Sequence, residues 1–112
     1  MKPHVHILVV DDEINIRGAL VTMLEKKGHQ VRGVATAEEG LAQLEAASAE
    51  LVITDLRMPG IGGMEFLRRL KDAWPDTEVV VMTAYGSIDT AVEAMRCGAY
   101  DYLTKPIDRE RF

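Results

Sequence analysis

The segment Leu51–Asp55 reads LVITD: three apolar residues and a threonine lead directly to an aspartate. The run Leu51–Thr54 (LVIT) within it, Val5–Val10 (VHILVV) and Val79–Thr83 (VVVMT) are all short and nearly continuously apolar. Short runs of this kind, rich in β-branched residues, are typical of strands that are covered on both faces in a parallel sheet. Weaker strand patterns occupy Gln30–Val34 and Ala99–Leu103. The sequence therefore predicts five strands.

The segments between these strands carry apolar residues three and four positions apart, the spacing of one helix face. The four stripes are Ile16, Leu20, Met23 and Leu24; Leu41 and Leu44; Met64, Leu67 and Leu70; and Ile88, Val92 and Met95. We expect Met23, Met64, Met82 and Met95 to belong to the core. Gly28 and Gly98 stand where a left-handed residue closes a helix, and Pro75 closes the third helix. A fifth helix begins at Ile107 and is cut short at Phe112.

Strands and helices thus alternate five times. Repeated right-handed βαβ crossovers give an α/β fold, a doubly wound parallel sheet with helices on both faces. The length of 112 residues suits one domain. We expect residues 1–112 to be the N-terminal part of a longer protein, because the fifth helix is so short.

Composition restricts the function. A formal net charge of −5 disfavours nucleic-acid binding by this domain itself, and Arg68, Arg69 and Lys71 are interpreted as a solvated helix face. The single cysteine, Cys97, cannot form an intrachain disulfide and suits a reducing cytoplasm. The N-terminal apolar run is too short to span a membrane. We therefore expect a cytoplasmic domain without membrane contact.

Polar residues gather where the predicted strands end. Asp11 and Asp12 follow the first strand, Asp55 the third, Thr83 ends the fourth, and Lys105 follows the fifth. Ligands of open parallel sheets bind beyond these carboxyl ends. Three carboxylates that meet there repel one another unless a cation offsets their charge, and an all-oxygen ligand set suits Mg²⁺.

A carboxylate beside bound Mg²⁺ can act as a nucleophile toward phosphorus and form an aspartyl phosphate. In such a site Lys105 supplies a second positive charge, and the hydroxyl of Thr83 donates to a phosphoryl oxygen. A plainer interpretation is that Asp12 caps the first helix. Capping leaves Asp55 unexplained, because that residue follows an apolar strand and precedes a segment that includes Pro59 and Gly60. Gly60, Gly62 and Gly63 are interpreted as a flexible loop.

Three segments resemble the signature blocks of response regulator receiver domains, the phosphoacceptor modules of two-component signalling. They read LVVDDE, LVITDLRMPGIGGMEFLRRL and VVVMTAYGSIDTAVEAMRCGAYDYLTKP, and the resemblance covers nearly the whole chain. It implies a flavodoxin-like fold with five parallel strands in the order 2-1-3-4-5. The stretch from Ala84 to Leu103 further resembles the nitrogen-regulatory (NtrC-type) class, which activates sigma-54 promoters.

The resemblance also implies roles for individual residues. Asp55 accepts a phosphoryl group from a phosphohistidine of a sensor histidine kinase. Asp12, Asp55 and the backbone carbonyl of Arg57 bind Mg²⁺, and Asp11 acts through a metal-bound water. Lys105 pairs with the phosphoryl group, and Pro106 follows it in the cis form.

The same resemblance implies a switch. Thr83 turns inward to the phosphoryl group, and Tyr102 follows from an outward to an inward orientation. Tyr102 is equally interpreted as a half-buried aromatic residue on an edge strand. The surface from the fourth helix to the fifth changes with it, controls an attached output domain for transcription activation, and offers a homodimer contact. Arg57 and Tyr85 are expected to shield the phosphoryl group and slow its hydrolysis.

Three other classes of protein fit the sequence less well. A haloacid-dehalogenase-like phosphatase usually carries a second aspartate two residues after the nucleophile, and here that residue is Arg57. A flavin-binding flavodoxin needs a phosphate loop after the first strand, where the acidic residues would repel phosphate. A degenerate receiver would lack part of the set that is complete here. We therefore expect a switch rather than an enzyme, with self-catalysed phosphotransfer and slow autodephosphorylation.

Overall fold

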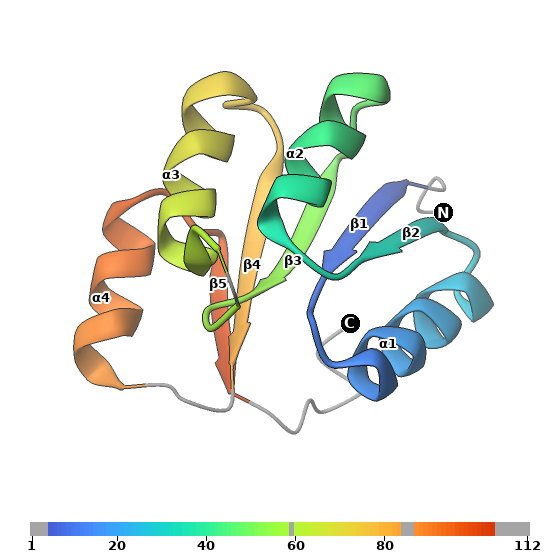
Figure 1. Cartoon of the computed structure of the whole chain (residues 1–112), viewed down its shortest axis with the longest axis horizontal. Coiled ribbons are helices and arrows are strands. Elements are labelled where there is room, and N and C mark those ends of the chain that lie inside the picture. The colour runs from blue at the N-terminus through green and yellow to red at the C-terminus, as the bar shows by residue number, and fades with distance from the viewer. Residues whose placement is uncertain (1–4, 59, 84–86, 105–112) are drawn as a thin grey trace.

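A single sheet of five parallel strands organises the chain, in the order β2-β1-β3-β4-β5. The computed structural model describes residues 5–58, 60–83 and 87–104. The strands are β1 (His6–Val10), β2 (Gln30–Val34), β3 (Leu51–Asp55), β4 (Glu78–Thr83) and β5 (Asp101–Thr104). The helices are α1 (Ile14–Lys26), α2 (Ala37–Ala46), α3 (Gly62–Ala73) and α4 (Ile88–Arg96). This order of elements confirms the predicted fold (Figure 1).

The core lies in two layers because neighbouring residues of a strand point to opposite faces of the sheet. In β1, Leu8 and Val10 face the layer that contains Phe66 of α3. Ile7 and Val9 face the other layer, which contains Leu20 and Leu24 of α1. All four strand residues are buried, which explains why β1 reads as a continuous apolar run.

Both predicted glycine stops are confirmed. Gly28 and Gly98 have φ angles of 97° and 102°, and each closes its helix in a Schellman motif. After α4, Gly98 N–H donates to Met95 O and Ala99 N–H donates to Ala94 O. These bonds hold the backbone of Ala99 to the helix, so β5 begins at Asp101 and not at Ala99 as predicted.

Two expectations about helices were wrong. The stripe of α4 does not enter the core: Ile88, Val92 and Met95 are 82%, 44% and 48% exposed, and Ala94 alone among the residues of α4 is buried. Gly62 and Gly63 do not form a loop but begin α3. The predicted fifth helix, Ile107–Phe112, lies outside the described residues. Among the helices that are described, none is long and apolar enough to cross a membrane.

Candidate functional site

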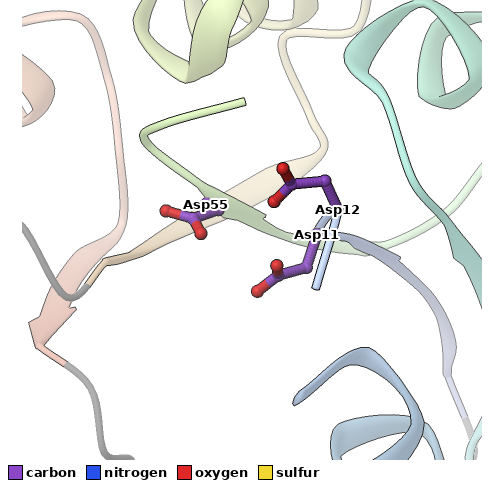
Figure 2. A group of neighbouring side chains, drawn as sticks. All are labelled: Asp11, Asp12 and Asp55. Carbon is purple, nitrogen blue, oxygen red and sulfur yellow. The ribbon is translucent and has the colours of Figure 1, made fainter. Parts of the chain in front are cut away.

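Three aspartates meet beyond the carboxyl ends of β1 and β3. Figure 2 shows the side chains of Asp11, Asp12 and Asp55 grouped there, and one carboxylate oxygen from each lies within 4.8 Å of the others. The grouping follows from strand register, because Val10 of β1 pairs with Thr54 of β3. The residues that follow this pair, Asp11 and Asp55, therefore leave neighbouring strands at the same level.

Backbone amides orient two of these carboxylates. The Oδ1 atom of Asp11 accepts the N–H of Glu13 at 2.9 Å, and Oδ1 of Asp55 accepts the N–H of Arg57 at 3.2 Å. Each bond is made to the residue two positions along the chain, the pattern by which aspartate stabilises a turn. Both carboxylates are thus held by the loops that follow their strands.

Asp12 does not cap α1, and the plainer interpretation of this residue is wrong. The N-cap position belongs to Glu13, whose side chain makes no capping hydrogen bond. Asp12 is exposed, whereas Asp11 and Asp55 are 0% and 5% exposed. Its carboxylate therefore extends the acidic group toward solvent.

The donor set fits a hard divalent cation. Three carboxylates so close together repel one another, and burial of two of them increases the cost of their charge. Only oxygen atoms are offered, which favours Mg²⁺ over softer metals. Asp11, Asp12 and Asp55 are the residues that would hold such an ion. Arg57 brings its backbone to the same loop, where its N–H already contacts Asp55.

Two further residues position the site: Arg17, which no sequence pattern indicated, and Gly63, which was predicted to lie in a loop. The guanidinium of Arg17, on α1, donates to the carbonyl of Asp11 at 2.8 Å and so braces the turn after β1. Gly63, in the first turn of α3, donates its N–H to the carbonyl of Leu56 at 2.9 Å. A Cβ at Gly63 would lie 2.2 Å from the backbone oxygen of Asp55. Only glycine allows α3 to approach the aspartate so closely.

The expected switch residues lie on the next two strands. Thr83 ends β4 and is fully buried. Tyr102 lies on the edge strand β5, is partly buried and packs against the core layer of α3, as expected for a half-buried aromatic residue. The structure places its hydroxyl beside α4, 2.7 Å from Oγ1 of Thr90. Lys105, Pro106 and Tyr85 lie outside the described residues.

Comparison with known proteins agrees with this arrangement. The model of the family described as "Response regulator receiver domain" matches residues 7–112. The chain therefore belongs to the response regulator receiver domain family.

Curated relatives are longer than this chain. The "Response regulator protein FleR" of Pseudomonas aeruginosa is 43% identical over 102 residues, which cover 91% of this chain and 22% of FleR. The "Transcriptional regulatory protein ZraR" of Klebsiella oxytoca is 44% identical over 110 residues, which cover 96% of this chain and 24% of ZraR. The chain thus spans about a quarter of these relatives.

Solved structures support both the family and the nitrogen-regulatory resemblance. NtrX from Brucella abortus matches with a TM-score of 0.91 and 36% identity, over 97% of this chain and 25% of NtrX. A structure of the beryllofluoride-activated NtrC4 receiver domain dimer matches with a TM-score of 0.90 and 37% identity, over 95% of this chain and 88% of that chain.

Proposed function

We propose that this receiver domain accepts a phosphoryl group on Asp55 from the phosphohistidine of a sensor histidine kinase and acts as a switch. The observation that carries the proposal is the meeting of three carboxylates at the carboxyl ends of β1 and β3, with Asp55 held from two sides. Its backbone is packed under Gly63, and its side chain accepts from Arg57 N–H. A fixed nucleophile needs little reorientation before it reacts.

In the proposed transfer, a carboxylate oxygen of Asp55 attacks the phosphorus, and the P–N bond to the kinase histidine breaks as the P–O bond forms. Bound Mg²⁺ supplies positive charge that offsets the carboxylates and the phosphoryl oxygens. We propose Asp12, Asp55 and the carbonyl of Arg57 as its direct ligands and Asp11 as a ligand through water. Thr83 donates its hydroxyl to a phosphoryl oxygen, and Lys105 adds a positive charge.

The domain then passes its state to other proteins. We propose that the surface of α4, β5 and the following segment changes with the inward movement of Tyr102, with Pro106 in the cis form. This change would control a covalently attached output domain for transcription activation from sigma-54 promoters, in the cytoplasm. The exposed apolar residues Ile88, Val92 and Met95 support α4 as the face that contacts a second copy of the chain.

Asp55 is tested by intact mass after incubation with Mg²⁺ and acetyl phosphate. We expect the parent chain to gain one phosphoryl group only when Mg²⁺ is present, and Asp55→Asn to gain none. Asp72→Asn is the matched control, because Asp72 is an exposed residue on α3 outside the acidic group. No gain in the parent chain, with its folding verified, would instead indicate a degenerate receiver that works through contacts alone.

The lifetime of the phosphorylated form is tested separately. We propose that Arg57 and Tyr85 limit access of the hydrolytic water. Arg57→Asn and Tyr85→Ala are therefore expected to lose the phosphoryl group faster than the parent, as followed by intact mass over time. Equal rates in the three proteins would contradict this role.

A further inference from the structure

The phenol of Tyr102 is tied to the first turn of α4. Its hydroxyl lies 2.7 Å from Oγ1 of Thr90, at a partly buried contact between β5 and α4. Thr90 is the third residue of α4 and belongs to a capping box with Ser87. The hydroxyl of Thr90 thus takes part in the capping box of α4 and also contacts the side chain of Tyr102 on the edge strand.

The hydroxyl of Thr90 has several hydrogen-bond partners. Its Oγ1 accepts the N–H of Ser87 at 3.1 Å, and it lies 3.2 Å from the carbonyl oxygen of Ser87, which can only accept. A hydroxyl has one proton and two lone pairs. The hydroxyl of Ser87 also lies 3.0 Å from Oγ1 of Thr90, and in this pair, as in the pair with Tyr102, either oxygen can donate. The contact with the phenol, at 2.7 Å, is the shortest of these and the only one that reaches another element.

This contact matters because apolar packing holds α4 only weakly. Ala94 is the one residue of the helix that is buried, while the apolar side chains of Ile88 and Val92 are exposed. An element with few buried contacts moves at low cost in free energy. Besides the ion pair of Glu93 with Arg68 of α3, the contact of Tyr102 with Thr90 is a polar contact that holds α4, and it lies at the first turn.

We propose that Thr90 is a positioning residue of the switch: its hydroxyl fixes the orientation of Tyr102 and couples it to the first turn of α4. The inference rests on the proposed function for its consequence, because the orientation of Tyr102 then influences how readily Asp55 is phosphorylated. A contact that is made in only one of two arrangements shifts the equilibrium between them.

The first test needs no phosphoryl group. The populations of the χ1 rotamers of Tyr102 are measured by NMR scalar couplings in the parent, Thr90→Val, Thr90→Ser and Ser87→Ala. Valine has the shape of threonine without the hydroxyl, so we expect Thr90→Val to redistribute these rotamers. Thr90→Ser keeps the hydroxyl and is expected to match the parent.

Ser87→Ala separates the coupling from capping. It removes a hydroxyl that lies 3.0 Å from Oγ1 of Thr90 in the same capping box but keeps the hydroxyls of Thr90 and Tyr102. It is therefore expected to lower helix stability and to change the Tyr102 rotamers less than Thr90→Val does. Unchanged rotamers in Thr90→Val, or an equal change in Ser87→Ala, would overturn the proposal.

The second test measures the coupling to Asp55. Beryllofluoride, which mimics an aspartyl phosphate, is titrated in the presence of Mg²⁺ and followed by fluorine NMR. We expect Thr90→Val and Tyr102→Phe each to shift the half-saturating concentration about fivefold, the size of one net hydrogen bond. The double variant is expected to shift it no further.

The outcomes distinguish the two proposals. The coupling to Asp55 would be overturned by shifts that add in the double variant. It would also be overturned if the parent chain binds beryllofluoride and neither single variant shifts the half-saturating concentration. Failure of the parent chain to bind beryllofluoride would overturn the proposed function instead, and the rotamer measurement would still decide the role of Thr90.

Discussion

The helices α3 and α4 are both amphipathic, but they differ in how far their apolar side chains are buried. In α3, Phe66, Leu67 and Leu70 are fully buried, whereas the large apolar side chains of α4 are exposed and only Ala94 is covered. An apolar stripe therefore marks a face that avoids water but does not say what covers it. In α3 that cover is the sheet, and in α4 we propose that it is another protein surface.

The difference matches the positions of the two helices. The N-terminal turn of α3 packs on the backbone of Asp55 at Gly63, so this helix fixes the proposed phosphoacceptor. By contrast, α4 lies beside the edge strand β5 and contacts it through Thr90 and Tyr102 (Figure 1). The helix α3 is packed firmly where the proposed phosphotransfer needs a fixed atom, and α4 has few buried contacts where the proposed switch needs movement.

The largest effect on stability is expected from truncating Phe66, a buried side chain of α3. Phe66→Ala should lower the free energy of unfolding by about 3–5 kcal/mol, because it removes a fully buried ring and leaves a cavity. Val92→Ala on α4 should change it by less than about 0.5 kcal/mol, as for other surface positions. Denaturant unfolding followed by circular dichroism measures both. Equal losses in the two variants would remove the contrast between the helices.

The variant Gly63→Ala is expected to lower stability less than Phe66→Ala, and also to lower phosphorylation of Asp55. The added Cβ would meet the backbone oxygen of Asp55 at 2.2 Å, so the variant should lose about 1–3 kcal/mol of stability through overpacking. Its phosphorylation by acetyl phosphate should fall as well, because the strain acts on the acceptor itself. Intact mass and denaturant unfolding measure the two effects.

Gly18→Ala is the matched control for this variant. Gly18 lies within α1, where a Cβ would meet nothing within 4 Å. Alanine is expected to stabilise this helix by up to about 1 kcal/mol and to leave phosphorylation unchanged. A stabilising Gly63→Ala would show that the close approach of α3 to Asp55 does not constrain the site.

These two glycines show what the sequence can and cannot predict. The strands and the acidic group were predictable, because parallel strands read as apolar runs and the aspartates follow them directly. Gly63 was misread because glycines after Asp55 resemble a turn, and its role depends on an approach between two backbones. The contact between Thr90 and Tyr102 was missed because it joins two elements across a turn, and no periodicity within either element encodes it.

The exposed face of α4 offers the next test. If this face contacts a second copy of the chain, Ile88→Glu should weaken self-association of the phosphorylated domain by about tenfold or more, because it places an unpaired charge in an apolar interface. The side chain of Ile88 is 82% exposed, so the fold should be unaffected. Sedimentation equilibrium with beryllofluoride measures the dissociation constant, and Asp89→Asn controls for a neighbouring change of charge. Unchanged association would assign the face to a different partner.

The smallest effect is expected where the two helices touch. Arg68 of α3 forms an ion pair with Glu93 of α4, and both side chains are about half exposed. Glu93→Gln should lower the unfolding midpoint slightly, and the loss should shrink as salt screens the pair in the parent. Glu45→Gln, an exposed change on α2, controls for the overall charge. A loss as large as that of Phe66→Ala would mean that α4 is held to α3 by charge, and its weak apolar packing would then no longer imply a lightly held helix.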